Sequence, residues 1–98
     1  MRGYIIGTLE IDEASRRLSI DGVEIAAQPL VFAFLVYLLA NADRAVSKEE
    51  LLTVLWPGVH VAESSLQRVA SLARGLLRRA GSEEALESVQ RFGYRPRP

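Results

Sequence analysis

Guanidinium, amide and hydroxyl side chains recur through the last third of this 98-residue chain, and their types and spacing could do chemistry there. Arginine binds phosphates, and arginine, glutamine and serine can form hydrogen bonds with the edges of bases. Such groups recognise a polyanion without covalent chemistry, although the same pattern is also typical of an ordinary solvated surface. The candidate binding residues are Gln67, Arg68, Ser71, Arg74, Arg78, Arg79, Arg91 and Arg95.

The zero net charge of the chain conceals an asymmetry between its two parts. Residues 1–65 hold five Lys or Arg and nine Asp or Glu, whereas residues 66–98 hold seven Arg and three Glu. A small domain that gathers its arginines in one segment can present a basic face to a polyanion. Charge alone leaves the solvated-surface interpretation equally open.

The sequence offers no arrangement of side chains that indicates an enzyme, a metal site or a cofactor. Cysteine is absent, and His60, the one histidine, has no cluster of acids that would complete a metal site or a catalytic triad. The adjacent acids at 12–13 and 49–50 would point to different sides of a strand or helix, so neither pair converges. We therefore expect no catalytic residue, no metal and no cofactor.

Length and composition predict one cytoplasmic domain over residues 1–98. Apolar residues make up 49% of the chain, which favours a folded core over disorder. No apolar run reaches the roughly 18 residues that a membrane-spanning helix needs, and the first residues turn acidic too soon for a signal peptide. We expect no membrane contact from this segment.

The first 27 residues are typical of a three- or four-stranded antiparallel sheet. The stretch "YIIGTLEID" is apolar and β-branched around Gly7 and alternates at Leu9 and Ile11, and Asp21-Gly22 suits the positive φ angles of a two-residue hairpin turn. A three-helix core is predicted over residues 28–81. Pro29 marks the start of a central, nearly all-apolar first helix, and Gln28 before it is a poor cap.

Capping signals mark the next two helices. Ser47 and Glu50 form an S-x-x-E capping box in front of the apolar pattern "LLTVLW". The third helix is predicted at about 63–80, with Glu63 or Ser64 as its capping residue.

At about 100° per residue, the third helix has one apolar face and one polar face. The apolar face consists of Leu66, Val69, Ala70, Ala73, Leu76 and Leu77. The polar face consists of Gln67, Ser71, Arg74 and Arg78. Because the polar face carries no acid, it could meet bases and phosphates in a major groove, or it could simply face solvent.

Residues 82–95 predict a second hairpin, with its turn at 90–93 and with Val89 and Tyr94 in the core. The proline-rich residues 96–98 are expected to form a tail or the start of a linker. An N-terminal sheet, three helices and a basic C-terminal hairpin describe an α+β fold of the winged helix-turn-helix kind.

Three stretches extend this interpretation across nearly the whole chain. They are "GTLEIDEASRRLSIDGVEIAAQPLVFAFLVYLLAN", "RAVSKEELLTVLWP" and "FGYRPRP". Together they resemble the N-terminal sheet with the first helix, the second helix and the end of the wing in one family. That family is the OmpR/PhoB-type (CadC-like) winged helix-turn-helix DNA-binding domain of bacterial transcriptional regulators.

The resemblance implies sequence-specific binding to double-stranded DNA for transcriptional regulation. It implies a recognition helix at about 63–80 in the major groove and a wing at about 86–95 on the adjacent minor groove or backbone. Ser71 and Arg74 match residues of the family's recognition helix, and Arg95 matches the wing arginine that follows Gly-Tyr.

Several positions depart from the family pattern. Ala70 and Ala73 stand where bulky apolar residues are usual, and Leu72 stands where an exposed basic residue is common. Gln90 and Arg91 occupy positions that are usually Arg and Gly, which predicts a different turn geometry and the loss of one phosphate contact. The expected DNA-binding surface is altered but retained.

The sequence also suggests partners other than DNA. Loop 58–62 corresponds to a segment that contacts RNA polymerase in some family members. A domain of this size covers one half-site, so a homodimer or tandem copies are expected on DNA. The alternative function is a protein–protein interaction or dimerisation module with weakened DNA binding. Its surface would consist of Val69, Leu72 and Leu76. The competing interpretation is that Leu72 merely packs beneath the wing. A sheet that begins almost at the first residue favours the N-terminal domain of a longer regulator.

Overall fold

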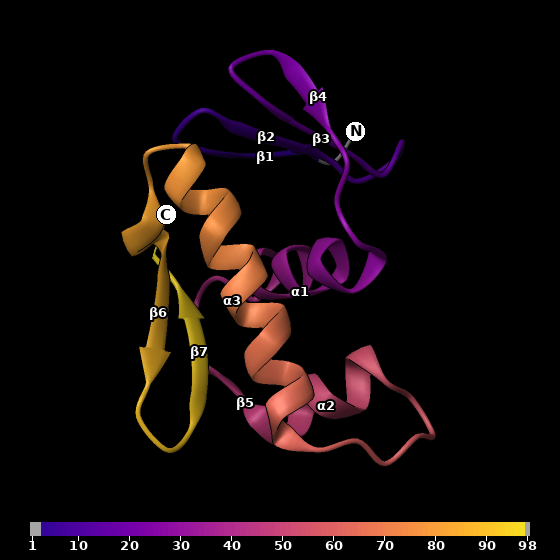
Figure 1. Ribbon diagram of the computed structural model, residues 1–98. Helices are drawn as coiled ribbons and strands as arrows, with labels where there is room; N and C mark the ends of the chain where they lie inside the picture. The colour runs from indigo at the N-terminus through magenta and orange to yellow at the C-terminus, as the bar shows by residue number, and fades with distance from the viewer. Residues whose placement is uncertain (1–2, 98) are drawn as a thin grey trace.

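The computed structural model describes residues 3–97 and joins two small sheets through three helices (Figure 1). The helices are α1 (Pro29–Ala40), α2 (Lys48–Leu55) and α3 (Glu63–Arg79), with a short 3-10 helix, η1, at Glu83–Ala85. The strands are β1 (Gly3–Ile6), β2 (Leu9–Asp12), β3 (Arg17–Ile20), β4 (Val23–Ile25), β5 (Val46–Ser47), β6 (Leu86–Val89) and β7 (Gly93–Pro96). This order is a winged helix-turn-helix, as the sequence predicts.

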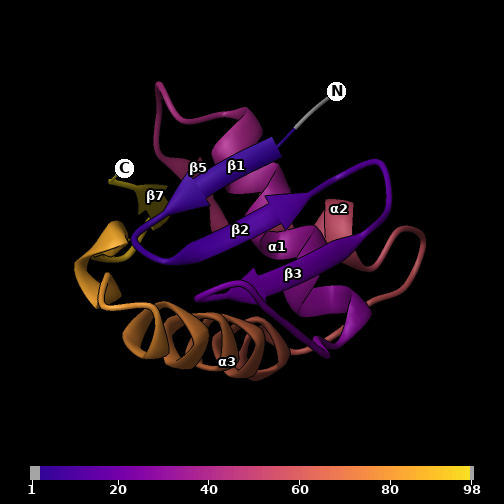
Figure 2. The same ribbon diagram turned by 90° about the horizontal axis from the view of Figure 1, so that it is seen from above.

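The N-terminal sheet has four antiparallel strands in the order β1-β2-β3-β4. Leu9, Ile11 and Leu18 are buried in the core that the sheet shares with the helices. Asp21 and Gly22 form the turn between β3 and β4 with φ angles of 53° and 78°, which confirms the predicted hairpin. Figure 2 shows the sheet lying over α1, with α3 running beside it on the β3 side.

The central helix of the core is α1. It begins at Pro29, and its N-cap Gln28 makes no side-chain hydrogen bond, both as predicted. Phe34 is fully buried and meets the ring of Tyr94 in β7 edge-on, with ring centroids 5.6 Å apart. The N-terminal sheet, α3 and the wing are therefore joined through α1 in one core.

The N-terminus of α2 is capped by Ser47 alone. Its Oγ accepts a hydrogen bond from the backbone N–H of Glu50 at 3.1 Å, which confirms the predicted cap. The Glu50 carboxylate, which the capping box would turn toward Ser47, instead accepts hydrogen bonds from Arg44 at 2.9 and 2.6 Å and from the Tyr37 hydroxyl. Because Tyr37 lies in α1, Glu50 ties the start of α2 to the end of α1.

Neither Glu63 nor Ser64 caps α3, so this part of the prediction is wrong. The N-cap is Ala62, which has extended backbone angles and makes no side-chain cap hydrogen bond. The end of the helix follows a stronger signal. Gly81 has a φ of 76°, and its N–H donates to the carbonyl oxygen of Arg78 at 3.0 Å, as in glycine-terminated helices generally.

The wing belongs to a three-stranded sheet with the order β5-β7-β6. No sequence pattern indicates β5, because a two-residue strand is too short to show a periodic pattern. Gly93 permits the pairing of β5 with β7, since a Cβ at this position would collide with the carbonyl oxygen of Val46.

Two details of the hairpin differ from the prediction. Val89 is only half-buried, whereas Leu86 is buried in the core. Pro96 is the last residue of β7 and is buried, so it belongs to the wing and not to a tail. The backbone N–H of Arg97 also bonds to η1, and Pro98 lies outside the described residues.

Candidate nucleic-acid interface

The two sides of α3 have different chemistry along its whole length. The buried side consists of Leu66, Val69, Ala70, Ala73 and Leu77, with Leu76 half-buried at its border. The opposite side carries Ser64, Gln67, Arg68, Ser71, Gly75, Arg78 and Arg79. The predicted apolar face is therefore confirmed, and the polar side holds hydroxyl, amide and guanidinium groups. The acid of α3, Glu63, is exposed at the first residue of the helix, where it pairs with Lys48.

Most of the predicted binding residues on α3 are exposed on this polar side. They are Gln67, Arg68, Ser71, Arg78 and Arg79. At about 1.5 Å per residue, the segment from the first to the last of them is about 18 Å long. The structure thus brings these five side chains onto one continuous helical surface.

Arg78 is exposed but engaged with an acid. Its Nη2 lies 2.9 Å from Oε2 of Glu83 in η1. Their hydrogen bond raises the pKa of the Arg78 guanidinium and lowers the pKa of the Glu83 carboxyl. Any phosphate that binds Arg78 must compete with Glu83 for it.

Arg74 differs from its neighbours because it turns toward the wing. Its Nη2 donates to Oγ of Ser88 at 3.0 Å and to the carbonyl oxygen of Leu86 at 3.4 Å, both in β6. The side chain is half-buried between α3 and the hairpin. Arg74 therefore does not project freely from the polar side of α3.

The tip of the wing presents Arg91 and Phe92, which are both exposed. Arg91 has a φ of 61°, in the left-handed region that glycine adopts without strain. The turn therefore has a glycine-like backbone despite the arginine, and not the altered geometry that the sequence suggests. Among residues 3–97, no acid forms an ion pair with Arg91.

Arg95 does not join the surface of α3. Successive strand residues point to opposite faces, so Arg95 and its cross-strand partner Glu87 lie on the face of the hairpin away from Ser88 and Arg74. Nε and Nη2 of Arg95 lie 3.1 and 2.9 Å from Oε1 of Glu87. Nε of Arg97 is 3.8 Å from the same oxygen.

Lys48, the first residue of α2, is not among the residues predicted from the sequence. Its backbone N–H donates to the carbonyl oxygen of Phe92 at 2.8 Å, and its Nζ lies 3.0 Å from Oε2 of Glu63. Lys48 thus connects the start of α2 with the start of α3 and with the wing tip. Only one signal could have drawn attention to it, namely a cation at a helix N-terminus, where the helix dipole disfavours positive charge.

The loop between α2 and α3 is exposed and carries His60 away from any acid cluster. Val59, 61% exposed, lies with Leu52 and Trp56 along an open groove of about 450 Å³. Among residues 3–97, no group of three or more His, Asp or Glu could hold a metal ion. Within the same range, no helix is long and apolar enough to cross a membrane.

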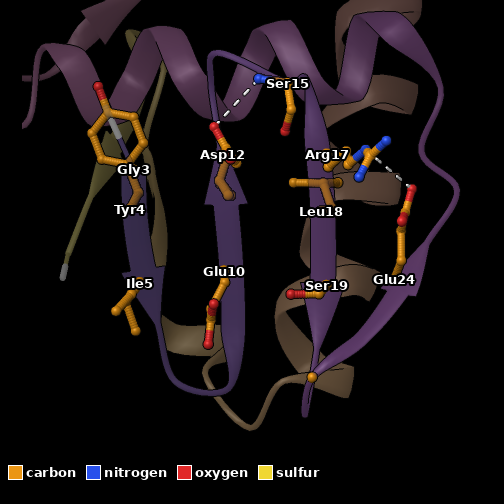
Figure 3. Close-up of a pocket in the computed structure, with 12 residues that line it drawn as sticks. Gly3, Tyr4, Ile5, Glu10, Asp12, Ser15, Arg17, Leu18, Ser19 and Glu24 are labelled. Carbon is orange, nitrogen blue, oxygen red and sulfur yellow. Dashed lines mark hydrogen bonds and ion pairs between the residues drawn. The ribbon is translucent and has the colours of Figure 1, made fainter. Parts of the chain in front are cut away.

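The outward face of the N-terminal sheet is acidic (Figure 3). Glu10, Asp12 and Glu24 line a shallow hollow of about 660 Å³ there. Nε of Arg17 is 3.9 Å from Oε2 of Glu24, and Oδ1 of Asp12 accepts hydrogen bonds from the backbone of the next turn. Figure 1 places this face at the opposite end of the molecule from the wing tip, so it does not extend the basic surface.

Leu72 does not pack beneath the wing. It is 38% exposed and lies beside Leu76, Gln28 and Val31, where α3 passes the start of α1. The wing lies on the other side of α3, next to Arg74. The prediction that Leu72 packs beneath the wing is therefore wrong. Its side chain is partly packed, but against the start of α1.

A family model places the chain among known proteins. The model described as "Transcriptional regulatory protein, C terminal" matches residues 22–96. The chain therefore belongs to this family, as an OmpR/PhoB-type winged-helix domain of transcriptional regulators and not an enzyme. The transcriptional regulatory protein TrcR of Mycobacterium tuberculosis (strain ATCC 25618 / H37Rv) is 30% identical over 96 residues. That alignment covers 95% of this chain and 36% of TrcR, so the chain spans about a third of that relative.

Two solved structures share the fold. The RstA DNA-binding domain of Klebsiella pneumoniae, in complex with the RstA box, has a TM-score of 0.78 at 23% identity and covers 98% of this chain and 97% of that chain. The response regulator DrrB of Thermotoga maritima, an OmpR/PhoB homologue, has a TM-score of 0.85 at 23% identity. That match covers 98% of this chain and 44% of DrrB.

Proposed function

We propose that this domain binds double-stranded DNA sequence-specifically in transcriptional regulation. In this proposal α3 lies in the major groove, and the wing, about 86–95, contacts the adjacent minor groove or backbone. The observation that carries the proposal is the polar side of α3, which offers hydroxyl, amide and guanidinium groups on one continuous surface. Family membership and a neighbour solved with its DNA site support it.

The side chains divide into two roles. Gln67, Arg68 and Ser71 lie toward the N-terminal half of α3, where a recognition helix usually meets base edges. Four arginines are the proposed phosphate contacts, namely Arg78, Arg79, Arg91 and Arg95. Arg78 and Arg95 must leave Glu83 and Glu87 to act in this way, and exposed ion pairs of this kind are weak because water screens them.

The salt dependence of binding tests how many of these arginines reach phosphates. Each phosphate contact adds about −0.9 to the slope of log affinity against log salt, so four contacts give a slope of about −3 to −4. If only the arginines without an ion pair took part, Arg79 and Arg91, the slope would be about −2. We expect the steeper slope, because the dense charge of DNA outcompetes exposed carboxylates.

The experiment is a selection from random duplexes, followed by a salt titration of the domain on the selected sequence. We expect one short motif, or two copies about 10 base pairs apart if two domains bind as a dimer or in tandem. No enrichment together with no binding at low salt would refute the proposal. Gln67→Ala should flatten the preference at one base position, and Arg79→Gln should weaken all duplexes equally.

A second candidate function is a protein–protein interface centred on Leu72. Its partial exposure on a helix that otherwise turns polar groups outward favours this function. Sedimentation of Leu72→Glu beside the parent domain is the test. A parent that self-associates and a variant that does not would support the interface, whereas two monomers would exclude a dimer through Leu72.

We also propose loop 58–62 as a contact for RNA polymerase. The exposed Val59, which lies with Leu52 and Trp56 along the open groove, supports this contact, because exposed apolar side chains grouped along a groove are typical of interaction sites. Val59→Asp should reduce capture of RNA polymerase by the DNA-bound domain and leave DNA affinity unchanged. Equal capture by the parent and the variant would contradict the proposal.

A further inference from the structure

Arg74 contacts the strand of the wing sheet that has no neighbour on its outer side. The order β5-β7-β6 makes β6 an edge strand, which is attached to the rest of the sheet only through β7. In the ladder with β7, the N–H of Arg97 donates to the carbonyl oxygen of Ala85 at 2.6 Å, so the next pair, Leu86 with Pro96, is a non-hydrogen-bonded pair and the Leu86 carbonyl points to the open side of β6. Arg74 supplies a donor to the Leu86 carbonyl oxygen at 3.4 Å and a second hydrogen bond to Ser88 Oγ at 3.0 Å.

These two hydrogen bonds join α3 directly to β6 of the wing. The wing meets α1 through the ring of Tyr94 against Phe34, and it meets α2 through the backbone of Lys48. From the middle of α3, Arg74 adds a direct link to β6. Figure 1 shows α3 and the hairpin running side by side across this link.

We propose that Arg74 is a positioning residue that fixes the wing to the recognition helix, and that it does not itself read a base. This inference rests on the proposed DNA binding. A helix and a hairpin that enter adjacent grooves bind better when their relative position is already fixed, because less freedom is lost on binding. Both hydrogen bonds use Nη2 and hold the half-buried side chain against β6, so contact with a base would compete with them.

Two readouts distinguish positioning from base reading. Arg74→Ala should accelerate amide hydrogen exchange in β6 and β7 relative to α1, by about two- to tenfold for one or two lost hydrogen bonds. It should weaken binding to the selected duplex and to random duplexes by the same factor, again about two- to tenfold, and leave base preferences unchanged. Ser88→Ala, at an exposed position, should give a smaller effect in the same direction.

A double-mutant cycle and a matched control complete the test. The variant that combines both substitutions should bind DNA no more weakly than Arg74→Ala, because the two side chains act through one contact. Arg78→Ala removes the same charge one helical turn away. It should lower DNA affinity but leave hydrogen exchange in the wing at the parental rate, since its partner Glu83 lies outside the strands.

The possible results separate this inference from the proposed function. A parental exchange rate in Arg74→Ala, whether base preference is lost or kept, would overturn the positioning role. If the parent bound no duplex, DNA binding would be refuted. Faster hydrogen exchange in the wing of both Arg74→Ala and Ser88→Ala would then still establish that Arg74 fixes the wing.

Discussion

At the wing tip, Arg91 has a backbone conformation with φ of 61°, which costs a residue with a side chain about 1–2 kcal/mol relative to glycine. Its side chain is exposed, and within residues 3–97 it forms no ion pair that would offset this cost. A strained backbone that carries an exposed charge suggests a role outside folding. The proposed contact with DNA phosphate gives Arg91 such a role.

Arg91→Gly should therefore change stability and binding in opposite directions. We expect the free energy of unfolding to rise by about 1 kcal/mol, because glycine adopts the left-handed region freely. The salt slope of DNA binding should become shallower by about 0.9, because one phosphate contact is lost. Urea unfolding and salt titrations measure the two effects.

Arg91→Gln is the matched control for this change. It removes the charge but keeps a side chain at the strained position. The salt slope should therefore become shallower by the same amount as in Arg91→Gly, without a gain in stability. If Arg91→Gly lost affinity and Arg91→Gln did not, backbone geometry and not charge would explain the role of this residue.

At the scale of elements, the pairing of β5 with β7 can be tested at two glycines, one in close contact with neighbouring backbone and one with open space around it. A Cβ at Gly93 would collide with the backbone of β5, so Gly93→Ala should destabilise the domain by about 1–3 kcal/mol or more. Gly75 in α3 has no atom within 4 Å of an added Cβ. Gly75→Ala should therefore stabilise the domain by up to about 1 kcal/mol, because alanine favours a helix. Denaturant midpoints that shift equally for both variants would contradict this account of the β5–β7 pairing.

The contacts of Glu50 at the junction of α1 and α2 should make the stability of the fold depend on pH. Hydrogen bonds from Arg44 and Tyr37 lower the pKa of the Glu50 carboxyl to about 2, below its ordinary value of 4.5. A carboxyl with a lowered pKa stabilises the fold above its unfolded-state value, and this contribution is lost as the pH falls from about 4.5 to about 2. Glu50→Gln should thus be less stable than the parent at pH 7, with a difference that shrinks across this range.

The measurement is the urea midpoint of the parent and Glu50→Gln at a series of pH values. Glu49→Gln is the matched control, because Glu49 is exposed and makes no ion pair or side-chain hydrogen bond among residues 3–97. A difference between the parent and Glu50→Gln that stays constant from pH 7 to pH 2 would show that the junction does not depend on the Glu50 charge.

Across the whole molecule, opposite charges lie at different places. The outward face of the N-terminal sheet carries Glu10, Asp12 and Glu24 beside one arginine, Arg17, whereas α3 and the wing carry six exposed arginines. Interactions between exposed charges are largely screened beyond about 10 Å at 0.1 M salt. The position of a carboxylate, and not its effect on net charge, should therefore decide whether it affects DNA binding.

Two substitutions with equal effects on net charge test this prediction. Glu87→Gln releases Arg95 and should raise DNA affinity by about 1.4- to fivefold, the worth of an exposed ion pair. Glu10→Gln should leave affinity unchanged, because Glu10 lies in β2 and the N-terminal sheet is at the opposite end of the molecule from the wing tip (Figure 1). Anisotropy titrations at 0.1 M salt measure both, and an equal gain from both variants would indicate that net charge dominates.

The sequence by itself determined the features whose signals are local. The Asp21-Gly22 turn, the Ser47 cap, the Gly81 end of α3 and the two faces of α3 all depend on residues within a few positions of one another. Backbone angles, capping hydrogen bonds and helical periodicity are set at that range, so they can be recognised without knowing the fold. The polar side of α3 was predicted for this reason.

Only the tertiary structure decided the features that depend on which distant segments meet. Glu50 binds Arg44 and Tyr37 in place of the expected capping partner, β5 exists because β7 passes beside it, and Arg74 turns to the wing. Long side chains such as arginine and glutamate can reach several partners. The partner they take is set by packing between elements, and that packing appears only once the chain has folded.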